Sequence, residues 1–136
     1  MSEPFSIPVR VYIEDTDAGG IVYYVNYLKY MERARTELVR SLGYDKPAMP
    51  REGLLLVVHS AQIQYRRSAR LDDTLRATAA IGKLGRAGIT FEQKIWRDGE
   101  IICQGVVKVA CVAENNRKPC ALPASIYSAL KAACKE

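Results

Sequence analysis

The chain has only one histidine, and its four cysteines form no Cys-x-x-Cys pair, so the usual ligand set of a zinc site is missing. We therefore expect no bound metal. The chain also begins without the basic and apolar stretches of a secretion signal. Cysteines in a protein that is not exported are expected to be reduced thiols of the cytoplasm. These four are Cys103, Cys111, Cys120 and Cys134.

Long apolar runs, internal repeats and low-complexity tracts are absent as well. No apolar run reaches the roughly 20 residues that cross a bilayer, so we expect no transmembrane segment. The sequence carries neither a nucleic-acid recognition motif nor aromatic residues interleaved along a basic face, which argues against a nucleic-acid partner. Its net charge of +5 is moderate and fits a phosphate-bearing ligand.

The composition that is present is typical of a soluble globular protein, with 49% hydrophobic and 26% charged residues. A chain of 136 residues can bury one core but is short for two ordinary domains. We predict a single domain over residues 1–136.

Hydrophobic spacing predicts one long helix among five strands. Apolar positions recur every three or four residues over 26–42, with Asn26 as the expected N-cap and Gly43 as the C-cap. Alternating apolar residues predict strands over 7–14, 54–65, 75–81, 89–97 and 101–112. A short helix is expected over 125–134. Strands joined by short turns form an antiparallel sheet, so we expect an α+β fold whose sheet covers the long helix.

Two local patterns refine this prediction. Asp98-Gly99 favours a two-residue hairpin turn, because such a turn needs a positive φ at both positions. Along the strand over 54–65, strict alternation predicts that Val57, His59 and Tyr65 share one face of the sheet.

The segment 14–24 places carboxylates beside a glycine pair, just before the long helix. A carboxylate that faces the exposed N–H groups of a helix N-terminus is suited to attack on a carbonyl group. Gly19 and Gly20 would let the backbone approach a ligand closely. From the residues alone, two interpretations of Asp17 stay open: a catalytic carboxylate, or a turn residue. Asp15 is interpreted as structural, bonded to backbone or to an arginine.

Several segments together resemble a known family. Val9-Arg10-Val11-Tyr12 leads into the long motif over 14–23, and the similarity continues over 26–27, 31–37, 65–66, 69–73 and 119–123. Through these residues the chain resembles the hotdog-fold 4-hydroxybenzoyl-CoA thioesterase family, and its YbgC-type acyl-CoA thioesterase branch most closely. The resemblance implies a single hotdog domain, with a five-stranded antiparallel sheet wrapped around one long helix.

The resemblance also implies an activity, a ligand and an assembly. It implies hydrolysis of acyl-CoA to a free carboxylic acid and CoA, with no cofactor beyond the CoA of the substrate and product. Members of the family form homodimers, often homotetramers, with the site at the subunit interface. An acyl carrier protein is an alternative partner.

By this resemblance, Asp17 is the catalytic carboxylate, as nucleophile or general base, and the backbone N–H of Tyr24 polarises the thioester oxygen. Many members of the branch have histidine in place of Tyr24, so we expect no mechanism that depends on an imidazole there. Lys83 and Arg86 are expected near the nucleotide of CoA. The full set of expected substrate-binding residues is Gly19, Gly20, Val25, His59, Ser60, Lys83 and Arg86.

Other functions stay open at this stage. A protein of the same fold could bind acyl-CoA or an acyl carrier protein without turnover. A hydratase or dehydratase is disfavoured, because no histidine lies near Asp17 in the sequence. His59 alternates with apolar residues and could simply be packed, and basic residues at turns, such as Arg66 and Arg67, are interpreted mostly as solvated charge. The sequence does not specify the acyl group.

Overall fold

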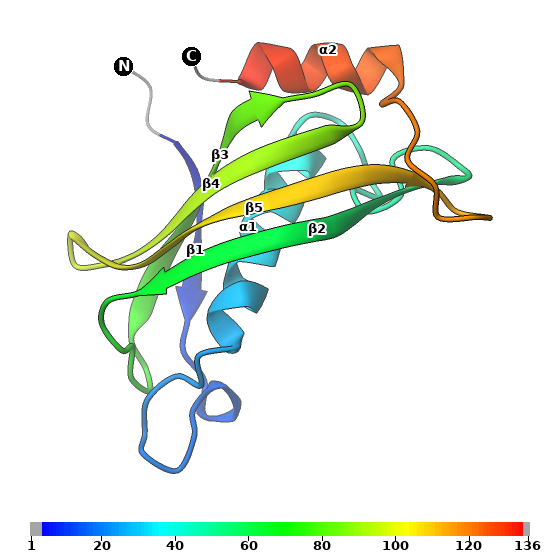
Figure 1. Cartoon of the computed structure of the whole chain (residues 1–136). Coiled ribbons are helices and arrows are strands. Elements are labelled where there is room, and N and C mark those ends of the chain that lie inside the picture. The colour runs from blue at the N-terminus through cyan, green and yellow to red at the C-terminus, as the bar shows by residue number, and fades with distance from the viewer. Residues whose placement is uncertain (1–3, 135–136) are drawn as a thin grey trace.

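A computed structural model describes residues 4–134 and arranges them as one antiparallel sheet with a long and a short helix (Figure 1). The strand order is β1-β3-β4-β5-β2. The strands are β1 (Phe5–Arg10), β2 (Leu54–Tyr65), β3 (Thr74–Leu84), β4 (Gly88–Arg97) and β5 (Glu100–Ala113), and the helices are α1 (Asn26–Ser41) and α2 (Ala124–Ala133). The predicted α+β architecture of a five-stranded antiparallel sheet, a long helix and a short C-terminal helix is confirmed.

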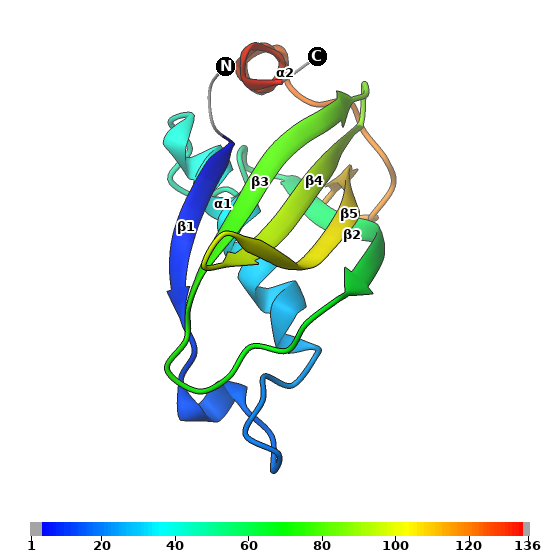
Figure 2. The same cartoon turned by 90° about the vertical axis from the view of Figure 1, so that its left-hand side faces the viewer.

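The sheet curves around α1, and the core lies between its concave face and the helix (Figure 2). Helix α1 buries the stripe that the spacing of three and four predicted, including Tyr27, Tyr30, Met31 and Ala34. Side chains of every strand pack against the buried core, with Phe91 among the largest fully buried. Removal of this apolar surface from water is what holds α1 against the sheet.

Strand β2 lies at the edge of the sheet and pairs only with β5. The register between the two strands shifts between Val58 and Ser60, which places a β-bulge at His59. A bulge adds one residue and reverses the alternation beyond it. Leu56 and Ile63, an odd number of positions apart, therefore both pack against the core. The predicted single face from Val57 through His59 to Tyr65 is wrong for this reason.

The inner face of β2 is only partly covered. Helix α1 makes its most extensive contacts with β3, β1 and β4. Val58 on β2 remains 53% exposed. The edge of the sheet therefore combines unpaired backbone groups with uncovered apolar surface.

The first predicted strand, over 7–14, is wrong beyond Arg10, where β1 ends. The chain then forms a single 3₁₀ turn, Ile13–Asp15. The Asp15 carboxylate accepts the Tyr12 N–H at 2.8 Å and closes this turn. A carboxylate that bonds to nearby backbone competes with extended structure, and here the 3₁₀ turn forms instead of further strand. The structural interpretation of Asp15 agrees with this contact.

The start of α1 also differs from the prediction. Asn26 is the first helical residue, and Val25 occupies the N-cap position. The Asn26 side chain donates to the Asp15 carbonyl at 2.8 Å instead of capping its own helix. The prediction of Asn26 as N-cap is therefore wrong, because its amide ties the helix to the preceding loop.

The predicted turn at Asp98-Gly99 and the predicted end of α1 near Gly43 agree with the structure. Asp98 and Gly99 both have positive φ angles, +51° and +81°, as the predicted hairpin requires. Gly43 follows α1 with φ +105°, which only glycine adopts without strain. Strand β3 runs on to Leu84, three residues beyond its predicted end. No helix within residues 4–134 has the length and apolarity that a membrane span requires.

Candidate active site

The loop before α1 is a tight turn with Asp17 near its tip. Thr16 and Val22 form an isolated antiparallel bridge. Asp17 N–H donates to the Ile21 carbonyl at 3.0 Å, and Gly20 N–H donates to the Asp17 carbonyl at the same distance. Gly20 has φ +79°, in the left-handed region that favours glycine. These bonds fix the backbone on either side of Asp17.

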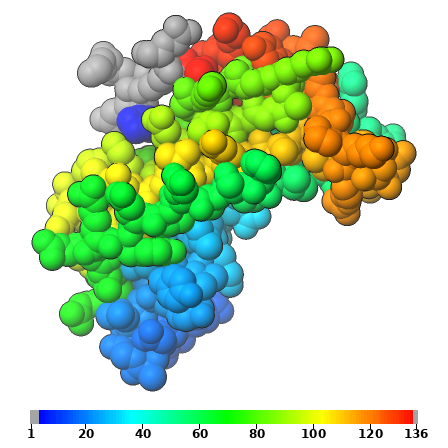
Figure 3. All heavy atoms as spheres, viewed as in Figure 1, coloured from blue at the N-terminus to red at the C-terminus, as the bar shows by residue number. Residues whose placement is uncertain are grey.

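Other contacts anchor this loop between α1 and the connection that leads into β3. The Asp15 carbonyl accepts both the Asn26 side chain at 2.8 Å and the Tyr23 N–H at 2.9 Å. Val22 N–H donates to the Ala69 carbonyl at 2.8 Å. In Figure 3 the loop and the first turn of α1, in blue, form the lower end of the molecule beside the green end of β2.

The Asp17 carboxylate is exposed, with one oxygen held by backbone. Its Oδ1 accepts the Gly19 N–H at 2.8 Å. A Cβ atom at position 19 would lie 3.3 Å from the same oxygen, so glycine gives the carboxylate its room. Within residues 4–134 no cation forms an ion pair with Asp17, and its second oxygen has no hydrogen-bond partner. One oxygen is thus oriented while the other is available for chemistry.

The first turn of α1 leaves backbone donors unused. The N–H groups of the first three helical residues each donate to the carbonyl three positions earlier, in 3₁₀ fashion. The N–H groups of Tyr24 and Val25 find no acceptor among the residues that the structure describes. Unpaired N–H groups at a helix N-terminus form a positive pole that suits an anionic oxygen.

Asp17 and Tyr24 line the same cavity, whose volume is about 310 Å³. Its size is at the lower end of the range for small-molecule sites. Four tyrosines and two arginines contribute to its wall. The lining residues are Asp17, Ile21, Val22, Tyr23, Tyr24, Tyr27, Tyr65, Arg66, Arg67 and Ser68.

The tyrosines form one contiguous wall. The Tyr24 ring lies edge-on to Tyr23 at 5.1 Å and to Tyr65 at 5.7 Å between centroids, and Tyr65 also contacts Tyr27 at 5.7 Å. The Tyr27 hydroxyl accepts the Ala69 N–H at 2.9 Å. Burial raises the pKa of Tyr27 and of Tyr65, so both stay neutral. The part of the wall that the tyrosines form is therefore uncharged, and the charged lining residues are Asp17, Arg66 and Arg67.

The other predicted substrate-binding residues are divided between this loop and distant parts of the sheet. Gly19, Gly20 and Val25 lie in or beside the Asp17 loop. His59 and Ser60 lie on the exposed part of the edge strand β2, at the bulge. The cavity around Asp17 includes neither of them.

Lys83 and Arg86 lie at the other end of β3 from Asp17. The Asp17 loop meets the chain just before β3, where Ile21 bridges Arg70. Lys83 is near the end of β3, and Arg86 lies in the turn to β4, where its carbonyl accepts the Leu122 N–H at 2.9 Å. A strand of this length spans roughly 35 Å. One chain therefore does not bring Lys83 or Arg86 to Asp17.

Sequence reasoning missed the contribution of the β2 exit to the site. Tyr65, Arg66 and Arg67 line the cavity although they lie far from Asp17 along the chain. The similarity over residues 65–66 was the one signal that could have pointed to them. No three His, Cys, Asp or Glu side chains within residues 4–134 are grouped so that they could share a metal ion.

The antiparallel sheet wrapped around one helix, with the carboxylate loop at the helix N-terminus, defines the hotdog class of fold. Comparison with known proteins agrees. Residues 11–130 match the Thioesterase-like superfamily, and the chain belongs to that family. The expected relationship to YbgC-type thioesterases is also confirmed by the relatives below.

Three relatives illustrate the relationship. The acyl-CoA thioesterase YbgC of Haemophilus influenzae is 43% identical over 92% of this chain and 93% of its own length. The acyl-CoA thioester hydrolase YbgC of Escherichia coli is 39% identical over 93% of this chain and 96% of its own. The solved structure of a probable thioesterase from Bartonella henselae is similar with a TM-score of 0.79 at 33% identity, covering 89% of this chain and 100% of that one.

Proposed function

We propose that this chain is an acyl-CoA thioesterase that hydrolyses acyl-CoA to a free carboxylic acid and CoA. The observation that carries the proposal is that one cavity is lined both by Asp17, which has a free carboxylate oxygen, and by Tyr24, whose backbone N–H is unused. The identity to relatives named acyl-CoA thioesterase supports the choice of substrate class.

The proposed chemistry follows from how charge moves in the reaction. As a thioester carbonyl is attacked, negative charge develops on its oxygen, and the Tyr24 N–H is a fixed donor for that charge. The free oxygen of Asp17 either adds to the carbonyl carbon or takes a proton from the water that does. The C–S bond then breaks, and CoA leaves as a thiolate that takes up a proton. In the nucleophilic route, water subsequently hydrolyses the acyl–Asp17 intermediate.

This mechanism does not need an imidazole at position 24. The Tyr24 ring packs against Tyr23 and Tyr65, and Tyr24 is 57% exposed. In the proposed mechanism this ring lines the cavity and donates no proton. The backbone N–H is the same whichever side chain the position carries. The change from histidine to tyrosine therefore leaves the proposed oxyanion donor in place.

The proposal includes assembly into a homodimer or homotetramer with the sites at the subunit interface. The unpaired edge of β2 and the exposed Val58 support it, because pairing two such edges satisfies backbone groups and buries apolar surface. His59 and Ser60 on this edge would then face a second subunit. Lys83 and Arg86 would likewise act at a site only if it belongs to another subunit.

The test is a CoA-release assay over a panel of short, long and aromatic acyl-CoA substrates, run beside equilibrium binding of the same compounds. We expect thiol release with at least one of them. Saturable binding of acyl-CoA without release of thiol would contradict hydrolysis and favour the alternative, a protein that holds acyl-CoA or an acyl carrier protein without turnover.

A further inference from the structure

Two cysteine side chains meet near the end of β5, away from the Asp17 loop. The Sγ atoms of Cys111 and Cys120 are 3.8 Å apart, and neither cysteine is part of a disulfide. Neither is among the described residues that line the cavity around Asp17. The proposed reaction therefore gives this pair of thiols no function.

The backbone places the two cysteines opposite each other. After β5 the chain turns back, and Val112 and Pro119 form an antiparallel bridge. Cys111 and Cys120 are the next pair along this bridge, and the Cys120 N–H donates to the Cys111 carbonyl at 2.9 Å. Opposite residues of an antiparallel pair have Cα atoms about 4.5–5.5 Å apart, and a disulfide spans Cα distances of about 4.4–6.8 Å. Rotation of the side chains is therefore enough to bring the two sulfurs into bonding distance.

The two thiols differ in exposure and in reactivity. Cys111 is fully buried in the core, and Cys120 is half-buried against it. Burial, and then the hydrogen bond to Cys120, raise the pKa of Cys111 to about 11. Because the thiolate is the nucleophilic form of cysteine, the buried thiol does not react first at neutral pH. A reagent that comes from solvent meets Cys120.

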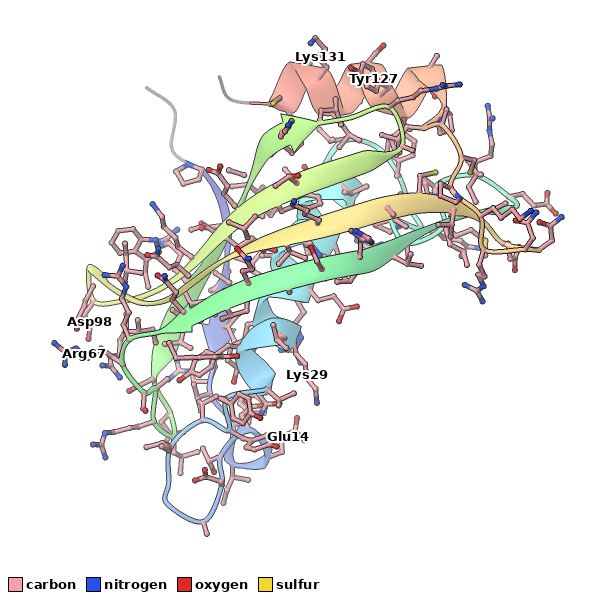
Figure 4. The ribbon with its side chains drawn as sticks, viewed as in Figure 1. Glu14, Lys29, Arg67, Asp98, Tyr127 and Lys131 are labelled. Carbon is pink, nitrogen blue, oxygen red and sulfur yellow. The ribbon has the colours of Figure 1, made fainter. Side chains whose placement is uncertain are left out.

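The contact between the cysteines lies where the C-terminal segment joins the sheet. Two residues beyond Cys120, the Leu122 N–H donates at 2.9 Å to the carbonyl of Arg86, in the turn between β3 and β4. Figure 4 shows this segment running from the end of β5 to α2, which carries the labelled Tyr127 and Lys131. A covalent bond between the cysteines would fasten the stretch that leads into α2 directly to β5.

From this arrangement we infer that Cys111 and Cys120 form a redox modification site, at which a small disulfide such as oxidised glutathione converts the two thiols into one internal disulfide. The inference is independent of the proposed function, because it concerns neither Asp17 nor the thioester. It assigns the first attack to the more exposed cysteine and the second to the buried one.

The two steps are thiol–disulfide exchanges. Cys120 loses its proton, and its thiolate attacks one sulfur of the small disulfide, whose S–S bond breaks and releases one thiol. Cys111 then gives up its proton and attacks the Sγ atom of Cys120. The Cys111–Cys120 bond forms, and the second thiol leaves. The protein loses two electrons and two protons, and the small disulfide gains both.

The test incubates the folded protein with oxidised glutathione, blocks the remaining thiols with an alkylating reagent, and locates the links by mass spectrometry. Trypsin cleaves after Arg117, so the two cysteines fall in separate peptides unless a disulfide joins them. We expect a link between Cys111 and Cys120 that dithiothreitol reverses. A protein that stays unmodified, or that stops at a glutathione adduct on Cys120, would overturn the inference.

Single substitutions separate the two steps. Cys111→Ser should stop the reaction after the first step, with glutathione attached to Cys120. In Cys120→Ser the buried Cys111 should react at least about tenfold more slowly than Cys120 does in Cys111→Ser. Equal rates of glutathione attachment in these two variants would contradict the assigned order.

The matched control is Cys134→Ser, which removes another half-buried cysteine of the described chain. It should form the link between Cys111 and Cys120 to the same extent as the parent chain. Loss of this link in Cys134→Ser would show that the pair does not act alone and would overturn the inference.

Thermal unfolding tests whether the folded backbone holds the pair in bonding position. The oxidised parent protein should melt at least about 4 °C above the reduced one, since a closed loop lowers the entropy of the unfolded chain. The difference should disappear after reduction and should be missing in Cys111→Ser. A disulfide that forms without raising the melting temperature would refute the attachment of the C-terminal segment.

Discussion

Among single residues, Asp17 and Tyr24 divide the proposed chemistry between a side chain and a backbone group. Asp17 Oδ1 is held by Gly19 N–H at 2.8 Å, and its second oxygen is free. Tyr24 contributes a donor that no residue in the described chain uses. A substitution at position 24 should therefore matter only if it changes the backbone.

This division predicts opposite results for two substitutions of Tyr24. Tyr24→Phe keeps the backbone N–H, so kcat for acyl-CoA should stay near the parent value. Tyr24→Pro removes the N–H and should lower kcat by about 10²–10³-fold, the usual effect of losing one oxyanion donor. Proline is tolerated near the start of a helix, and circular dichroism checks that α1 still forms. Equal kcat in folded Tyr24→Pro would rule out the backbone donor.

Gly20 tests whether the turn that carries Asp17 needs its left-handed backbone. Gly20→Ala should lower the free energy of unfolding by about 1 kcal/mol, since φ +79° strains any residue with a Cβ atom. The control is Gly85→Ala, where an added Cβ would make only an ordinary contact, 3.6 Å from the Gly88 carbonyl oxygen. Urea unfolding measures both. A loss of stability in Gly85→Ala as large as in Gly20→Ala would contradict this explanation.

At the level of helices and strands, α1 carries a buried phenol that responds to pH. Tyr30 is fully buried, and its hydroxyl has no well-formed hydrogen bond within residues 4–134. Burial, and then the nearby Asp15 carboxylate, raise the pKa of Tyr30 above the usual value of 10.0. Because folding raises the pKa of Tyr30, the protonated phenol contributes its full stabilisation of the native state below pH 10.0. This stabilisation is lost as the pH rises from 10.0 toward the pKa of Tyr30 in the folded protein.

Above about pH 10, the free energy of unfolding should therefore fall by up to about 1.4 kcal/mol per pH unit for each such group. Tyr30→Phe removes one group and should make this fall shallower, with little effect at neutral pH. Urea unfolding between about pH 8 and pH 11 measures the slope. Identical slopes for the parent and Tyr30→Phe would show that Tyr30 does not titrate differently in the two states.

The strands also show which features the sequence could predict. The five strands, both helices and the Asp98-Gly99 turn follow from periodicity and local turn chemistry. The bulge at His59 does not, because it depends on how β2 registers with β5. The same limit holds for the site. Asp17 and Tyr24 are close in sequence, whereas Tyr65 reaches the cavity only because β2 ends beside the start of α1.

At the scale of the whole molecule, the uncovered edge of β2 predicts association of subunits. The parent chain should behave as a homodimer or homotetramer in light scattering after size-exclusion chromatography. Val58→Asp places a charge on the exposed apolar edge and should shift the chain toward monomer. CoA release should fall together with the oligomer if the sites lie between subunits. A fully active monomeric parent would contradict the proposed assembly.

In the proposed reaction, the thioester of the substrate enters the cavity that Asp17 and Tyr24 line. The proposed hydrolysis requires that the carboxylate at position 17 is the group that drives cleavage.

The most direct measurement is kcat for acyl-CoA hydrolysis by Asp17→Asn beside Glu14→Gln. Both variants remove one carboxylate charge from the same exposed segment, but only Asp17 lines the cavity. We predict that kcat falls at least about a hundredfold in Asp17→Asn and stays near the parent value in Glu14→Gln. Parent-like turnover in Asp17→Asn, or an equal loss in both variants, would contradict the catalytic role of Asp17.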